Sequence, residues 1–183
     1  MAIKIGFIGA PGSGKTTISQ NFVSLLRIES KKRVELIDEF ARSFVSTFQN
    51  TSIKDQYLIA HKQIDKENEF ESSDYLITDS PVILSLFYSY LCIDWNECVE
   101  RYYLNEIYKL LIDRIHMYDF LFYLNPLDDI NLDDGKRIHT NEQENLKINQ
   151  QISYFINLHK INYVCLKGTF EEKIKQSLSL VLC

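Results

Sequence analysis

The hydrophobic positions of the chain fall into two kinds of run. Five short, nearly continuous apolar runs predict strands at residues 3–8, 33–37, 75–78, 118–124 and 161–166. Between them, apolar residues recur every three or four positions, which predicts helices at about 15–27, 53–64, 81–93, 140–159 and 170–180. Strands that alternate with helices predict an α/β fold of three layers, in which helices cover both faces of a five-stranded parallel sheet.

Polar residues mark two of the helix starts. Ser80 is a suitable N-cap, and Pro81 fits the first helical position that would follow it. Thr140 and Gln143 have the spacing of a capping box. The helix that Thr140 would start has a predicted buried face, which consists of Ile148, Ile152, Phe155 and Ile156. No Pro/Gly-rich linker interrupts the chain, so we expect one domain over residues 1–183.

The first predicted strand is followed at once by GAPGSGKTT, residues 9–17, which we call the phosphate loop. It matches G-x-x-x-x-G-K-[ST] at every fixed position, and its place between a strand and an amphipathic helix is the context that this motif requires. Glycines let backbone N–H groups surround a phosphate, and the helix N-terminus adds a favourable dipole. The predicted nucleotide-binding residues are Gly9, Ala10, Pro11, Gly12, Ser13, Gly14, Lys15, Thr16 and Thr17. In this motif Lys15 contacts the β- and γ-phosphates and Thr16 ligates Mg²⁺, so we expect ATP and Mg²⁺ as ligands.

Carboxylates follow the second and third predicted strands. Asp79 ends the third strand, where it would hold Mg²⁺ directly or through water; its other interpretation is a helix cap. Asp38 and Glu39 follow the second strand and would face the same edge of the sheet, where one of them could accept a proton from an attacking hydroxyl. Arg42 would lie on the same helical face as these two carboxylates and clamp substrate or phosphate, unless it only forms a surface ion pair with them.

A polar segment follows the fourth predicted strand, at about residues 126–140, and its position and composition are typical of a small lid. An arginine in such a lid can stabilise charge that develops on the transferred phosphate, while closure excludes water. Arg137 is the predicted catalytic arginine, and Lys136 is the second choice. The alternative is a solvated loop without a catalytic role.

Other classes of phosphate-loop protein fit less well. A GTPase carries D-x-x-G after a later strand, but Asp79 is followed by Ser80, Pro81 and Val82. The segment from Asn125 to Asp128 has the ends of a guanine-reading N-K-x-D motif, with proline in place of lysine. The chain is also short for a helicase or a motor ATPase. These exclusions favour a small kinase.

Four segments, GAPGSGKTT, ELIDEFAR, YLITDSP and DDGKR, together resemble the P-loop kinases related to the ribosylnicotinamide kinase domain. Small bacterial and phage nucleoside or nucleotide kinases share this pattern, including phage enzymes that phosphorylate 5-hydroxymethyluracil in DNA. The resemblance implies a P-loop NTPase fold, ATP with Mg²⁺ as donor, and a hydroxyl or phosphate of a nucleoside-like acceptor. By position, Asp38 matches the acceptor-side carboxylate and Arg137 the lid arginine. The thymidylate-kinase D-R-Y/F and deoxynucleoside-kinase E-R-S triplets are replaced by Asp79-Ser80-Pro81.

Charge and composition affect the choice of partner. The net charge is −5, which disfavours duplex DNA and anionic membranes as partners, and no apolar run reaches the length of a membrane span. We therefore expect a cytoplasmic kinase with a small nucleoside-like acceptor, ahead of a kinase acting on DNA and of an ATPase switch that binds a protein. The sequence leaves open whether the protein forms a homodimer. Aromatic residues at 87–95 and 101–103 would stack on a base or belong to the core, and Gln56 or Gln63 would read the edge of the base.

Overall fold

The computed structural model describes residues 1–41, 52–124 and 142–183. The predicted lid lies outside this part of the chain, as do Arg42, Lys136, Arg137 and the Thr140 end of the predicted capping box. The side chains of Glu142 and Glu144 are likewise outside it.

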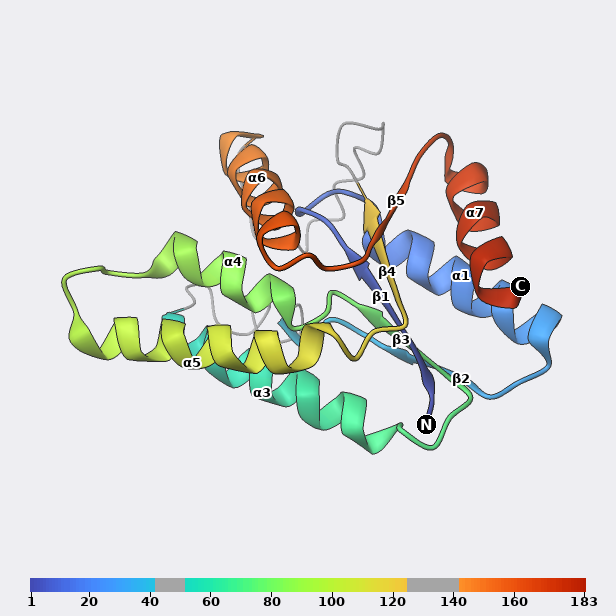
Figure 1. Cartoon of the computed structure of the whole chain (residues 1–183), viewed down its shortest axis with the longest axis horizontal. Helices are drawn as coiled ribbons and strands as arrows, with labels where there is room; N and C mark the ends of the chain where they lie inside the picture. The colour runs from blue at the N-terminus through green and yellow to red at the C-terminus, as the bar shows by residue number, and fades with distance from the viewer. Residues whose placement is uncertain (42–51, 125–141) are drawn as a thin grey trace.

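The described elements alternate in the predicted way (Figure 1). The strands are β1 (Ile3–Ile8), β2 (Val34–Ile37), β3 (Tyr75–Asp79), β4 (Phe120–Leu124) and β5 (Val164–Leu166). The helices are α1 (Lys15–Ser30), α3 (Ile53–Glu69), α4 (Ile83–Cys92), α5 (Cys98–Ile115), α6 (Glu142–Leu158) and α7 (Phe170–Leu182). The strands form one parallel sheet in the order β2-β3-β1-β4-β5, which confirms the predicted fold class.

Helices cover both faces of the sheet, which explains why the strands are apolar along their whole length. On one face, α1 and α7 pack over a core that includes Phe7, Phe22 and Phe122. The ring centroid of Phe7 lies 5.4 Å from that of Phe22 and 5.3 Å from that of Phe122. On the other face, α4, α5 and α6 enclose a second apolar cluster, and α3 packs against α4 and α5. None of the helices in the described ranges is long and apolar enough to cross a membrane.

The predicted start of α4 is wrong. The helix begins at Ile83, and Ser80 has a φ of 65°, so Ser80 and Pro81 belong to the preceding turn and do not cap the helix. The cause is close packing: a Cβ on Gly6 would lie 2.8 Å from Cγ of Pro81, so the proline ring sits directly against β1. This packing holds the chain at the carboxyl end of β3 close to the start of the phosphate loop.

The helix α5 was not predicted from the sequence. Only Ile107, Leu111 and Ile115 are buried along its 18 residues, and they lie on one narrow stripe at a spacing of four. Charged, aromatic and further aliphatic residues are mixed over the remaining faces, so the helical period of the apolar residues is weak in this segment.

Candidate functional site

The phosphate loop connects the carboxyl end of β1 to the first turn of α1. Gly12 and Gly14 have φ values of 80° and 83°, in the left-handed region that favours glycine. Gly14 is the N-cap of α1, and no side chain caps the helix there. The N-terminus of α1 is thus not capped by a side chain, and the N–H groups and dipole of a helix N-terminus favour an anion.

Lys15 folds back onto the phosphate loop. Its ammonium donates hydrogen bonds to the carbonyl oxygens of Gly9 at 2.9 Å and Ala10 at 3.0 Å, and the side chain is only 7% exposed. Close by, the hydroxyl of Ser13 is buried without a hydrogen-bond partner. A buried cation and a buried, unsatisfied hydroxyl in one glycine-lined turn fit a phosphate group, which would accept hydrogen bonds from both.

Asp79 lies at the same edge of the sheet. It is the last residue of β3 and pairs in register with Phe7 of β1, two residues before the phosphate loop begins. Its side chain is buried, and the Ser80 hydroxyl lies 3.5 Å from one of its carboxylate oxygens. The fold thus brings Asp79 to the edge from which α1 starts with Lys15 and Thr16. A carboxylate and a hydroxyl are ligands that Mg²⁺ prefers, so these two residues would hold the ion that accompanies a nucleotide.

A small cavity adjoins this edge on the side of β2 and α3. Its polar lining consists of Glu39, Gln63, Ser80, Ser85 and Tyr88. The cavity measures about 10 Å³, which is room for a single water, so a larger ligand has to displace lining side chains. Glu39 lines this cavity, whereas Asp38 is exposed to solvent beside it.

Two buried amides on α3 have unsatisfied polar atoms. Gln63 is 3% exposed; its Oε1 accepts from the N–H of Phe40 at 3.3 Å, while its Nε2 has no partner. Gln56 is 1% exposed and its Oε1 has no partner. The residues are seven positions apart and therefore lie on the same face of the helix. Buried amides are normally satisfied, so these two atoms are candidates for contacts with a polar ligand.

The aromatic residues of α4 and of the segments after it lie in different environments. Phe87 is part of the core, and Tyr88 lines the cavity. Farther along, Tyr90 stacks on the exposed Trp95 with ring centroids 6.3 Å apart, and Tyr102 is also exposed. Of this segment, Tyr88 is the ring that the structure places at the candidate acceptor side.

A phosphate loop at the carboxyl edge of this five-stranded parallel sheet defines a P-loop nucleotide-binding protein. The profile of a family described as an AAA domain matches residues 4–173, so the chain belongs to that family. No curated protein matches the sequence.

Solved structures of kinases share the fold at low sequence identity. A NadR protein in complex with NR superposes with a TM-score of 0.72 at 16% identity, over 91% of this chain and 46% of that one. Deoxyadenosine kinase from M. mycoides, with the products dCMP and dCDP bound, gives a TM-score of 0.62 at 16% identity, over 98% of both chains. Thymidylate kinase from Candida albicans gives 0.64 at 16% identity, over 99% of this chain and 91% of that one. The chain thus spans about half the length of the NadR structure and nearly all of the other two. These structures confirm the resemblance to the P-loop nucleoside and nucleotide kinases at the level of the fold.

Proposed function

We propose that the chain is an ATP-dependent phosphotransferase that moves the γ-phosphate to a hydroxyl or phosphate of a nucleoside-type acceptor. The observation that carries the proposal is the parallel pairing of β1 with β3, which brings Asp79 to the edge where the phosphate loop begins, while the next residue, Ser80, lines the acceptor-side cavity. A donor site with a polar acceptor site beside it is the arrangement that direct transfer requires. The molecules named for the similar structures, which are NR in one complex and the products dCMP and dCDP in another, support this class of acceptor.

The phosphate loop supplies the donor site. The N–H groups at the start of α1 and the ammonium of Lys15 would bind the triphosphate, after Lys15 exchanges its contacts with the Gly9 and Ala10 carbonyls for phosphate oxygens. Thr16 and Asp79 would hold Mg²⁺, which neutralises charge on the β- and γ-phosphates. Arg42 and Arg137 remain predicted to clamp the phosphates from outside the described residues.

A carboxylate after β2 would act as the base. When the acceptor is a hydroxyl, its oxygen forms a bond to the γ-phosphorus, the bond from that phosphorus to the β,γ-bridging oxygen breaks, and ADP leaves. The acceptor proton passes to the carboxylate. Asp38 is the predicted base, and the lining of the cavity favours Glu39 as its competitor. When the acceptor is a phosphate, no base is needed.

The unsatisfied amides suggest which edge the acceptor presents. The free Oε1 of Gln56 needs a donor, and the free Nε2 of Gln63 needs an acceptor. A ligand would satisfy the first with an N–H or O–H group and the second with an oxygen or ring nitrogen. A nucleobase or nicotinamide carries groups of both kinds.

The direct test is transfer of labelled γ-phosphate from ATP to a panel of nucleosides, nucleotides, NR and DNA that contains 5-hydroxymethyluracil. We expect transfer to a small acceptor, lost by about 100-fold or more in Lys15→Ala and unchanged in the exposed control Lys32→Ala. Transfer only to DNA, with binding that weakens steeply with salt, would instead support the kinase acting on DNA. Slow ATP hydrolysis that no acceptor accelerates would support the ATPase switch.

The base is identified by two conservative variants. With a hydroxyl acceptor, loss of the base lowers kcat by about 10²- to 10⁴-fold. Such a loss in Asp38→Asn with near-normal turnover in Glu39→Gln assigns the role to Asp38, and the reverse assigns it to Glu39. Full activity in both variants contradicts a carboxylate base after β2.

A further inference from the structure

Asn149 of α6 joins three parts of the fold at the phosphate loop. The side chain is 9% exposed, and its Oδ1 accepts hydrogen bonds from the N–H of Ala10 at 3.3 Å and from the hydroxyl of Tyr123 at 3.4 Å. Ala10 belongs to the phosphate loop and Tyr123 to β4. In Figure 1, α6 passes beside the connection between β1 and α1, as the contact with Ala10 requires.

The peptide groups of Ala10 connect Asn149 with the residues that would contact phosphate. The carbonyl of Ala10 accepts from the N–H of Ser13 at 3.2 Å and from the ammonium of Lys15 at 3.0 Å. Ala10 itself is completely buried. Its N–H therefore has Asn149 as its acceptor, while its carbonyl closes the turn of the phosphate loop.

Gly9, the residue before Ala10, leaves the phosphate loop little freedom to move. A Cβ on Gly9 would lie 2.5 Å from the carbonyl oxygen of Leu124, so the backbone of the loop passes directly against the end of β4. The start of the phosphate loop is thus held between β4 on one side and Asn149 on the other. Neither contact involves the Lys15 ammonium or the Ser13 hydroxyl, the two side-chain groups proposed to bind phosphate.

We infer that Asn149 is a positioning residue for the phosphate loop: it orients the Ala10 peptide and thereby the loop that binds the triphosphate. This inference rests on the proposed function, because it assumes that the loop binds ATP. Removing the amide leaves the buried N–H of Ala10 without an acceptor, and the loop has to move toward water to satisfy it. Phosphate binding depends on the direction of the loop N–H groups, so such a shift lowers the affinity for ATP.

The test compares nucleotide affinity with fold stability. We would measure the Kd for ATP with Mg²⁺ by calorimetry, and the unfolding temperature without nucleotide, for the wild type and four variants. Asn149→Ala should weaken ATP binding about three- to tenfold, the range that follows from the loss of one buried hydrogen bond. Gln150→Ala, at the exposed neighbouring position, should change neither quantity.

Two further variants separate positioning from packing. Ile152→Ala removes a fully buried side chain of the same helix, so it should lower the unfolding temperature but leave the Kd within twofold when measured well below that temperature. Tyr123→Phe removes the second donor to Asn149 and keeps the contact with Ala10, so its Kd should also stay within twofold.

The outcomes are distinguishable. An Asn149→Ala protein that binds ATP as tightly as the wild type overturns the inference, and so does a Tyr123→Phe protein with the same loss of affinity, because the effect would then come from the contact between β4 and α6. A wild-type protein that binds no ATP contradicts the proposed function itself.

Discussion

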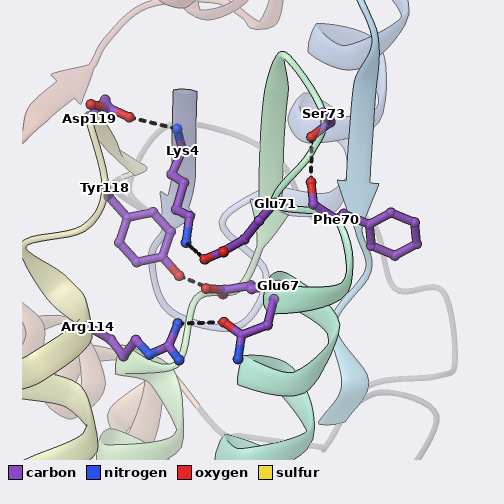
Figure 2. Close-up of polar contacts among 9 residues, drawn as sticks. Lys4, Glu67, Phe70, Glu71, Ser73, Arg114, Tyr118 and Asp119 are labelled. Atoms are coloured by element: carbon purple, nitrogen blue, oxygen red, sulfur yellow. Dashed lines mark hydrogen bonds and ion pairs between the residues drawn. The ribbon is translucent and has the colours of Figure 1, made fainter. Parts of the chain in front are cut away.

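A buried acid at the end of the sheet opposite the phosphate loop provides a test of the electrostatics of the fold (Figure 2). Glu67 of α3 is buried, and its carboxylate accepts a hydrogen bond of 2.7 Å from the hydroxyl of Tyr118. Burial raises the pKa of Glu67 above its usual value of 4.5, although the Tyr118 hydrogen bond and the positive charges of Lys4 and Arg114 oppose the shift. The Lys4 ammonium donates a hydrogen bond to the Glu71 carboxylate, and the Arg114 guanidinium donates one to the Asn68 side-chain oxygen.

The sign of the pH dependence follows from the raised pKa. The folded protein holds the Glu67 proton more tightly than the unfolded chain, so this group stabilises the fold fully below pH 4.5. That stability is lost as the pH rises from 4.5 through the raised pKa of the folded state. Glu67→Gln removes the titration and keeps an oxygen that can accept from Tyr118. The variant should therefore gain stability relative to the wild type as the pH rises above 4.5, and the difference should level off at higher pH.

The size of the expected stability change follows from the hydrogen bond that Tyr118 donates to Glu67. Above the raised pKa of Glu67, Tyr118→Phe removes a bond to a charged acceptor, which costs about 1.5–3 kcal/mol, equivalent to a fall of about 3–12 °C in Tm for a chain of this size. In the Glu67→Gln background the same change removes a neutral bond and should cost only about 0.5–1.5 kcal/mol. Urea unfolding followed by circular dichroism from pH 4 to pH 8 measures both quantities. A stability difference between Glu67→Gln and wild type that does not vary with pH would refute the reasoning.

Three further predictions concern other regions. The pKa of the half-buried Cys92 thiol is raised to about 11, mainly by burial, so at pH 8 only about one molecule in a thousand carries the thiolate. A disulfide reagent should therefore modify the exposed Cys98 and Cys183 before Cys92, and modification of Cys92 should accelerate up to about pH 11. Phe122→Ala removes a fully buried ring and should lower the free energy of unfolding by about 3–5 kcal/mol, with Phe122→Leu costing less in the same denaturation assay. Ser52→Ala breaks the capping box that Ser52 forms with Asp55 and should cost about 0.5–2 kcal/mol; an unchanged Tm in calorimetry would contradict this.

The strands and the phosphate loop were predictable because their signals are local. A buried parallel strand is apolar throughout, and the glycine pattern of residues 9–17 has few other uses. The placement of Asp79 at the same edge follows from parallel topology, since the strand ends coincide there. The helix start at Ile83 was not predictable, because it depends on the packing of Pro81 against Gly6, which are distant in sequence.

The contacts that support the site were also beyond the reach of the sequence. Asn149 lies in a helical segment whose predicted face was apolar, and nothing nearby in the chain indicates that its amide meets Ala10, 139 residues earlier. Gln56 and Gln63 were predicted as readers of a base edge. The structure adds that both are buried and that each has an unsatisfied atom, which composition alone does not reveal.

The polar residues on the buried face of α3 differ in how completely their hydrogen-bonding atoms are satisfied, and the difference follows their position along the helix. Glu67, near the C-terminal end of α3, is bound by Tyr118, and Gln63, one turn earlier, is bound on one side only, by Phe40. The Oε1 of Gln56, toward the N-terminal end, has no partner. If these polar side chains served only to order the fold, the most buried of them, Gln56, would be expected to be satisfied as Glu67 is. The unsatisfied groups instead occur from Gln63 toward the start of the helix, and Gln63 lines the cavity beside Asp79. In α3 the satisfied acid thus lies toward the C-terminal end and the unsatisfied amide atoms lie toward the N-terminal end, which is the distribution that the proposed acceptor site would require.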